Sequence, residues 1–165
     1  MGSRELISGK RVLIVDDEQD ILDTLAGLLD MCKLDTATTF EEGKRLLENN
    51  LYDVAILDIM GVQGFDLLDV ASRRGIPALM LTAHALSEES LKKSAEKGAY
   101  YFAPKDEIDR IHVFVADVLE AKEKHKSAWI KVFERLGHFY DKKFGGPDWR
   151  EKEKEFWEKR TRMLR

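Results

Sequence analysis

Short apolar runs alternate with amphipathic stretches from residue 11 to residue 104 of this 165-residue chain. The first, third and fourth runs, at 12–15, 54–57 and 78–81, are apolar at every position, as in parallel strands covered on both faces. Residues 34–38 and 100–103 predict two edge strands. Helices are predicted near 19–31, 40–48, 64–73 and 87–97, with a fifth that begins near Glu107. We therefore expect a doubly wound (βα)5 α/β fold around a parallel sheet.

Polar residues stand where four of these five predicted strands end. Asp16 and Asp17 follow the first strand, Asp58 the third and Thr82 the fourth, and Lys105 comes shortly after the fifth. Parallel strands end at one edge of their sheet, so we expect these side chains to share one cleft. Three carboxylates at close range repel each other unless a divalent cation on oxygen ligands, naturally Mg²⁺, and Lys105 offset their charge. Each residue alone has an ordinary structural role, but the joint pattern favours a functional site.

These residues resemble the response regulator receiver domains of two-component phosphorelays over about residues 10–120. The matching segments are Val12–Glu18, Val54–Met60, Met80–Ala83, Gly98–Ala99 and Phe102–Lys105. The resemblance implies a five-stranded sheet in the flavodoxin-like order 2-1-3-4-5. It also implies a signalling protein rather than an enzyme, because a receiver promotes only its own phosphorylation and dephosphorylation.

By this resemblance, Asp58 is the phosphoacceptor. It would take a phosphoryl group from the phosphohistidine of a sensor histidine kinase or of a phosphotransfer protein. Asp16, Asp17, Asp58 and the backbone carbonyl of Met60 would hold Mg²⁺, for which Mn²⁺ can substitute. The large apolar side chain of Met60 would also hinder attacking water and so slow the loss of the phosphoryl group.

The resemblance also assigns residues of the last two predicted strands. Thr82, Ala83 and Lys105 would contact the phosphoryl oxygens, and Phe102 matches the aromatic switch position of the family. His84, two residues after Thr82, would help to tune the phosphoryl lifetime. Phosphorylation would draw Thr82 and Lys105 inward, and would shift the packing of the face formed by the helix near 87–97, the strand 100–103 and the last helix.

The chain departs from the family pattern in two places. Receivers commonly have Pro four residues and Gly eight residues after the phosphoacceptor, whereas here that Pro is missing and Gly64 comes six residues after Asp58. The loop is thus two residues shorter. Receivers also often place Pro directly after the lysine, but here Pro104 precedes Lys105. Asp106, which follows, is predicted to cap the last receiver helix.

A change in charge divides the chain near residue 121. Residues 1–120 hold 13 Lys and Arg against 23 Asp and Glu, whereas residues 121–165 hold 14 against 8, together with all three tryptophans. We expect a flexible leader at 1–9, a receiver domain at 10–120 and a helical extension at 121–165. The single cysteine, Cys32, excludes an internal disulfide and a cysteine-type zinc site. With no apolar run long enough to span a membrane, we expect a cytoplasmic protein without a membrane partner.

The extension is predicted to form two amphipathic helices broken at residues 145–147. The first carries an apolar stripe at three- and four-residue spacing: Trp129, Val132, Phe133, Leu136 and Tyr140. The second is predicted to begin with a capping box at Asp148 and Glu151. Its apolar side would be Trp149, Phe156, Trp157, Met163 and Leu164. Two short helices cannot bury so many aromatic rings, so the stripe must rest on the receiver, on a second copy or on a partner.

The expected output is an interaction with a second copy or a protein partner, through the switching face or the extension helices. The acidic receiver could attract the basic extension, and phosphorylation would then change the face on which the extension rests. A nucleic-acid-binding tail is disfavoured, because Lys alternates with Glu at 151–155 and two helices fall short of a helix-turn-helix. A second alternative is a magnesium phosphohydrolase of the haloacid dehalogenase type. It is disfavoured, because that class has Asp-x-Asp after the first strand, whereas this chain has Asp16-Asp17-Glu18 and lacks the second acid.

Overall fold

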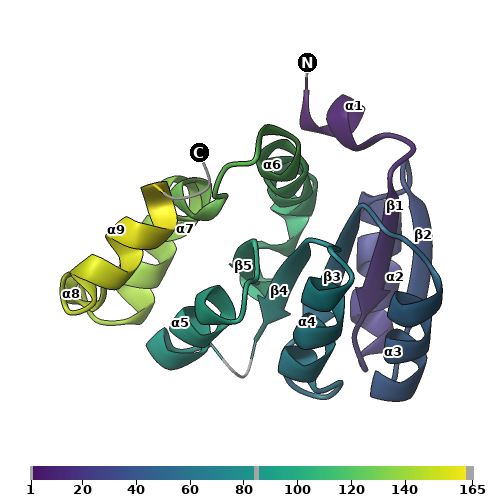
Figure 1. The fold of residues 1–165 in the computed structure, drawn as a ribbon, viewed down its shortest axis with the longest axis horizontal. Coiled ribbons are helices and arrows are strands. Elements are labelled where there is room, and N and C mark those ends of the chain that lie inside the picture. The colour runs from purple at the N-terminus through teal and green to yellow at the C-terminus, as the bar shows by residue number, and fades with distance from the viewer. Residues whose placement is uncertain (1, 84–85, 163–165) are drawn as a thin grey trace.

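The computed structural model describes residues 2–83 and 86–162. Its centre is a sheet of five parallel strands in the order β2-β1-β3-β4-β5, which confirms the predicted fold (Figure 1). The strands are β1 (Arg11–Val15), β2 (Lys33–Ala37), β3 (Val54–Asp58), β4 (Ala78–Thr82) and β5 (Tyr101–Pro104). Strands β3 and β4 are buried at every position, whereas the edge strand β2 is largely accessible. The uninterrupted apolar runs therefore mark the strands that helices cover on both faces.

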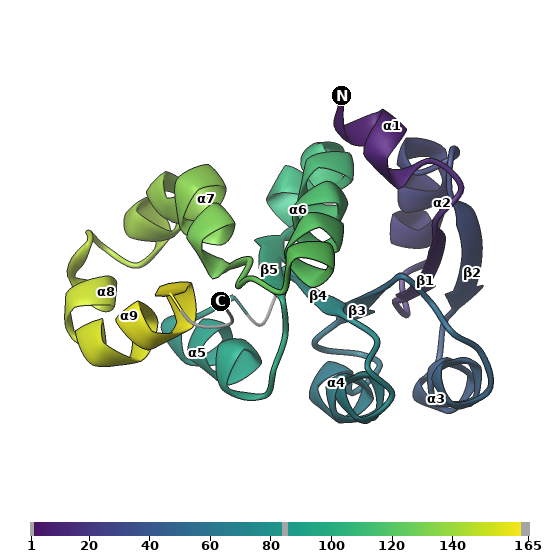
Figure 2. The same cartoon turned by 45° about the horizontal axis from the view of Figure 1, so that its top comes forward.

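Two layers of helices cover the sheet (Figure 2). Helices α2 (Gln19–Leu28) and α6 (Ile111–Lys124) lie on one face, and α3 (Phe40–Asn49), α4 (Gly64–Arg73) and α5 (Glu88–Glu96) lie on the other. The helix ends follow local sequence. Thr39 Oγ1 accepts a hydrogen bond from the Glu42 amide at the start of α3, and Gly98, with φ of +94°, follows the end of α5. No helix in the described part of the chain is long and apolar enough to cross a membrane.

Both ends of the receiver differ from the sequence expectations. Residues 1–9, expected to be a flexible leader, include a short helix, α1 (Ser3–Ile7), which packs against α6 and buries Ile7. At the other end, a 3₁₀ helix, η1 (Lys105–Arg110), precedes α6. Asp106 lies inside η1 with an exposed side chain and caps neither helix, so its predicted capping role is wrong.

After α6, the described part of the extension, up to residue 162, contains three helices rather than the two expected. They are α7 (Trp129–Lys143), α8 (Asp148–Glu151) and α9 (Lys154–Arg162). Gly145 and Gly146, with φ of +82° and +128°, end α7 within the predicted break. The capping box does not form, because Asp148 is already helical and the preceding Pro147 has no capping side chain. Two residues of the predicted second stripe, Met163 and Leu164, lie outside the described residues.

The extension rests on the receiver, alongside the β5 edge of the sheet (Figure 1). Helix α7 packs against β5, and α9 packs against α7. The extension buries six large side chains: Trp129, Val132, Leu136, Tyr140, Trp149 and Trp157. Of the three surfaces that could have covered the aromatic stripe, the structure places it on the receiver of the same chain. An edge strand has unpaired backbone groups, and here α7 covers that edge.

Candidate functional site

Three charged side chains converge at the carboxyl ends of the strands. Lys105 Nζ lies 2.8 Å from Asp16 Oδ2 and 3.2 Å from Asp58 Oδ1. Asp16 directly follows β1, Asp58 ends β3 and Lys105 directly follows β5. None of these side chains is more than 8% exposed. The parallel topology therefore brings together charged residues that are distant in the sequence, at the edge where they were expected.

Asp17, the third predicted carboxylate ligand, is exposed and faces the loop after β3. Gly61 in that loop has φ of +75°, and a Cβ atom there would lie 2.5 Å from the carboxyl carbon of Asp17. Only glycine allows this approach. A cavity of about 200 Å³ opens beside the contact. Its lining residues are Asp17, Glu18, Asp58, Met60, Gly61, Ala83 and Lys105.

The donor set at this cavity suits a hard divalent cation. Carboxylate oxygens of Asp16, Asp17 and Glu18 lie within 4.8 Å of one another. Asp58 is not a member of that group, but it lines the same cavity as Asp17 and Glu18. Mg²⁺ and Mn²⁺ prefer carboxylate and carbonyl oxygens. Lys105 pairs with three of the four carboxylates, those of Asp16, Glu18 and Asp58. The residues present therefore fit a magnesium ion in both chemistry and charge.

Burial sets the protonation of this cluster. It raises the pKa of Asp58 to about 7, and the neighbouring Asp16 carboxylate adds to the rise. Burial likewise raises the pKa of Asp16. For Lys105 burial acts to lower the pKa, but hydrogen bonds to Asp16 and Glu18 outweigh it and raise the pKa above its usual range. Lys105 is therefore a fixed cation, whereas Asp58 titrates near neutral pH until a further positive charge favours its ionised form.

The shortened loop after Asp58 closes tightly onto the end of β3. The Gly64 amide donates to the Ile59 carbonyl at 3.0 Å, and a Cβ atom on Gly64 would lie 2.2 Å from the Asp58 carbonyl oxygen. The Met60 side chain is 56% exposed at the cavity rim. The Met60 carbonyl accepts a hydrogen bond from the Val62 amide at 2.8 Å, so one of its two lone-pair directions is in use.

The remaining predicted residues divide between the cavity and the core. Thr82 is buried at the end of β4, opposite Pro104 in the sheet register, and the exposed Ala83 lines the cavity. Phe102 is fully buried in β5, with its ring in contact with an aromatic side chain of α7. His84 lies outside the described residues.

Sequence reasoning missed Glu18, a further partner of Lys105. Its Oε1 lies 2.8 Å from Lys105 Nζ, and its side chain is half exposed. Glu18 immediately follows the acidic pair after β1, so adjacency was the signal that could have revealed it. In this arrangement Lys105 is bonded more closely to Asp16 and Glu18 than to Asp58.

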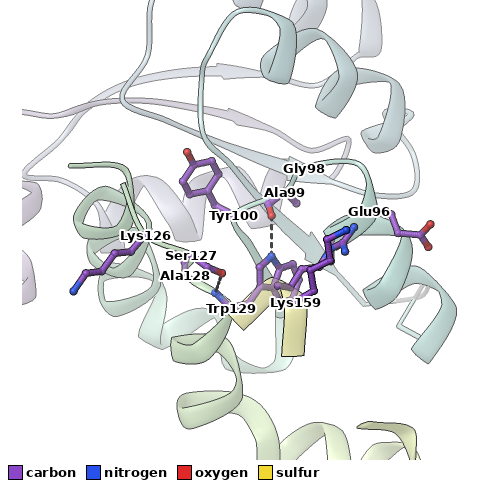
Figure 3. A pocket seen from close by; sticks show the side chains of 11 residues that line it. Glu96, Gly98, Ala99, Tyr100, Lys126, Ser127, Ala128, Trp129 and Lys159 are labelled. Atoms are coloured by element: carbon purple, nitrogen blue, oxygen red, sulfur yellow. Dashed lines mark hydrogen bonds between the residues drawn. The ribbon is translucent and has the colours of Figure 1, made fainter. Parts of the chain in front are cut away.

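The extension donates hydrogen bonds to two backbone carbonyls of the edge strand and its approach. Trp129 Nε1 donates to the Ala99 carbonyl at 3.1 Å (Figure 3). The Tyr140 hydroxyl donates to the Phe102 carbonyl at 2.7 Å. The rings of Tyr140 and Phe102 also lie in contact, with centroids 5.9 Å apart. Helix α7 therefore satisfies edge carbonyls that a sixth strand would otherwise bind.

An ion pair joins α7 to α6. Arg135 Nε lies 2.6 Å from Asp117 Oδ2, and Arg135 Nη2 lies 3.1 Å from Asp117 Oδ1. The buried Tyr101 hydroxyl donates to the same carboxylate at 2.7 Å. Asp117 is only 5% exposed, so these partners replace the water that a carboxylate would otherwise bind. Sequence reasoning missed this group, because neither residue carries a local motif.

The interface between the receiver and the extension contains a cavity. A cavity of about 330 Å³ lies beside Trp129, between the end of α5, the start of α7 and α9 (Figure 3). Ala99 and Gly98 line it from the receiver, and Lys126 and Lys159 line it from the extension. Tyr140, by contrast, is fully buried. Its ring lies next to that of Phe102, with centroids 5.9 Å apart.

The link between α8 and α9 forms two ion pairs with α5. Lys92 pairs with Glu153 at 3.2 Å and Lys152 pairs with Glu88 at 3.0 Å, and all four side chains are at least one third exposed. Exposed pairs of this kind contribute little to stability. The remaining predicted stripe residues pack among themselves: Phe133, Trp149, Phe156 and Trp157 form a chain of edge-to-face ring contacts.

The doubly wound fold and the acidic site with its lysine together define a receiver-type regulatory domain. The family model for the response regulator receiver domain matches residues 12–116. The chain therefore belongs to this family.

Relatives and solved structures agree with this assignment. The chain is 37% identical over 97 residues to the two-component response regulator ARR18 of Arabidopsis thaliana, covering 55% of this chain and 15% of that protein. It is 28% identical over 153 residues to the transcriptional regulatory protein TdiR of Thauera aromatica, covering 82% of this chain and 66% of that protein. A CheY-like receiver structure from Methanospirillum hungatei JF-1 superposes with a TM-score of 0.64 at 31% identity, covering 71% and 98% of the two chains. The chain thus spans less than two thirds of these two full-length relatives.

Proposed function

We propose that this protein accepts a phosphoryl group on Asp58 from the phosphohistidine of a sensor histidine kinase or a phosphotransfer protein. One Asp58 carboxylate oxygen would form the new bond to phosphorus, and the bond between phosphorus and the histidine nitrogen would break. The observation that carries the proposal is the position of Asp58 Oδ1, 3.2 Å from Lys105 Nζ beside an open acidic cavity. We place the protein in the cytoplasm, as expected for a receiver.

The chain's own residues would supply positioning and charge. Asp16, Asp17, Asp58 and the free lone pair of the Met60 carbonyl would hold Mg²⁺, which would neutralise charge on the transferring phosphoryl oxygens. Lys105 would bind one of those oxygens directly.

Two residues at the end of β4 would complete the contacts. Thr82 would donate its hydroxyl, and the exposed backbone at Ala83 would contact a third oxygen. The short loop packs against the end of β3, where Gly64 lies close to the Asp58 carbonyl oxygen. Phosphoryl transfer needs this positioning and neutralisation more than covalent help from the protein.

The test is phosphorylation of the full chain by acetyl phosphate with magnesium, followed by mass spectrometry. Wild-type protein is expected to gain one phosphoryl group, and Asp58→Asn is expected to gain none. Asp53→Asn, which changes an exposed carboxylate just before β3, is the matched control and should behave as wild type. An unchanged mass of wild-type protein, or equal labelling of Asp58→Asn, would contradict the proposal.

We further propose that the output is a protein interaction, with a second copy or another protein. Helix α7 covers β5, so a partner must either displace the extension from the face of α5, β5 and α6 or bind its outer side. Light scattering on the full chain, with and without magnesium and beryllofluoride, tests whether the site controls assembly. A change in mass on addition of beryllofluoride is expected if the output is a homodimer, and constant mass would leave binding to a different protein as the output.

A further inference from the structure

The extension holds strand β5 and its approach at two carbonyls. Trp129 binds the Ala99 carbonyl and Tyr140 binds the Phe102 carbonyl. A third attachment is indirect, through the carboxylate that Arg135 shares with the Tyr101 hydroxyl. Backbone bonds of this kind fix where the strand lies, whichever way its side chains turn.

Strand β5 leads directly into the phosphorylation site. Pro104, its last residue, lies opposite Thr82 in the sheet register, and Lys105 follows at once. Tyr140 binds β5 three residues before Lys105. The same strand therefore carries the contacts of the extension at one end and the site lysine at the other.

The ion pairs of Lys105 suggest how the site and the strand are coupled. Its Nζ lies 2.8 Å from Asp16 and from Glu18, and 3.2 Å from Asp58. A phosphoryl group on Asp58 adds negative charge and acceptor oxygens, which draw the ammonium group away from Asp16 and Glu18. Because Lys105 directly follows β5, such a movement would be transmitted to the end of that strand.

We propose that Tyr140 and Trp129 are positioning residues, which hold β5 where Lys105 pairs with Asp16 and Glu18. Docking of α7 and phosphorylation of Asp58 then oppose each other. This inference rests on the proposed function, and it adds a partner for the switching face: the chain's own extension. By thermodynamic reciprocity, the two effects are equal in size. If docking of the extension weakens beryllofluoride binding by some factor, beryllofluoride binding lowers the docking equilibrium constant by the same factor.

The tryptophans provide a direct probe of docking. All three belong to the extension, at positions 129, 149 and 157, and each is at most 5% exposed. Their fluorescence therefore reports the extension and not the receiver. In the full wild-type chain, saturation with magnesium and beryllofluoride is expected to shift tryptophan emission to longer wavelength, and to speed hydrogen exchange across residues 129–143. This first experiment uses only wild-type protein, so misfolding of a variant cannot affect it.

The second arm measures beryllofluoride affinity in Tyr140→Phe, which removes one hydroxyl and keeps the ring. The expected result is two- to tenfold tighter binding, the range that one hydrogen bond can supply. Tyr52→Phe is the matched control: it also loses one hydroxyl hydrogen bond, to Asp35 at 2.7 Å, but at the far edge of the sheet. Its affinity should equal that of wild type. Affinity of Tyr140→Phe that is unchanged or weaker, with unchanged tryptophan emission in wild type, overturns the proposal.

Acetyl phosphate labelling separates failure of this coupling from failure of the proposed function. If Asp58 is phosphorylated but neither emission nor affinity responds, only the coupling fails. If wild-type protein is not phosphorylated at Asp58, the proposed function fails and the coupling fails with it.

Discussion

Arg135 and Asp117 form a two-point ion pair across the boundary between the extension and the receiver. The guanidinium and carboxylate meet at 2.6 and 3.1 Å, the side-by-side geometry that suits an arginine fork. Asp117 is buried on α6, whereas the Arg135 side chain is about one third exposed. Without Arg135, the buried carboxylate would keep the Tyr101 hydroxyl as a partner but would lose its counter-charge.

Arg135→Ala is therefore expected to lower the free energy of unfolding by about 2 kcal/mol. This value allows for solvent screening of the partly exposed Arg135 side chain. Urea denaturation followed by tryptophan fluorescence measures this loss. Arg45→Ala is the matched control, because Arg45 also binds a carboxylate through two nitrogens, but on an exposed helix face. It should cost far less. Equal losses for the two variants would mean that the boundary pair stabilises the protein no more than a surface pair.

The raised pKa of Asp58 predicts a pH dependence of stability in metal-free protein. The folded-state pKa of about 7 exceeds the value of about 3.9 in an unfolded chain, so the folded protein binds this proton more tightly. Ionisation of Asp58 therefore costs stability as pH rises from about 4 to about 7. Asp58→Asn removes this cost, so its advantage over wild type should grow across that window and level off above it.

The advantage should reach at most about 4 kcal/mol, since three pKa units set the limit and partial solvation lowers it. Thermal unfolding in EDTA at several pH values measures it. Magnesium should remove the pH-dependent difference, because a bound cation favours the ionised carboxylate. Asp30→Asn, at an exposed turn, serves as the control. A difference between Asp58→Asn and wild type that does not vary with pH would contradict the assigned protonation.

The features that sequence could predict are those set by local pattern plus topology. Apolar runs identify strands, and parallel strands end at one edge, so the meeting of Asp16, Asp58 and Lys105 follows from the order of the chain. The pairing of Arg135 with Asp117 depends on how α7 docks, and no local pattern records that. Likewise, the sequence around Asp106 predicts a helix cap, but a 3₁₀ helix follows β5 and the α-helix begins only after it.

The contact between Gly61 and Asp17 predicts a specific effect on metal binding. Gly61→Ala would place a methyl group 2.5 Å from the Asp17 carboxyl carbon, so the carboxylate must move. Magnesium affinity, measured by calorimetry, is expected to fall about tenfold or more. Gly145→Ala has the same left-handed backbone, with φ of +82°, but no atom within 4 Å of the new methyl group. It should carry the backbone strain and leave magnesium affinity unchanged. Equal affinity in both variants would remove Asp17 from the metal site.

The exposed side chain of Met60 predicts the lifetime of the phosphoryl group. Met60 lines the cavity beside Asp58 and is 56% exposed. If Asp58 carries a phosphoryl group as proposed, the Met60 side chain would stand where water approaches the phosphorus. Met60→Ala opens this approach and should speed dephosphorylation by up to about tenfold, equivalent to about 1.4 kcal/mol in the barrier. Loss of phosphoryl label after removal of acetyl phosphate measures the rate. Ile130→Ala, which trims an apolar side chain of similar exposure on α7, should leave the rate unchanged. If Met60→Ala loses its label no faster than Ile130→Ala, then water reaches the phosphoryl group by a path that Met60 does not cover.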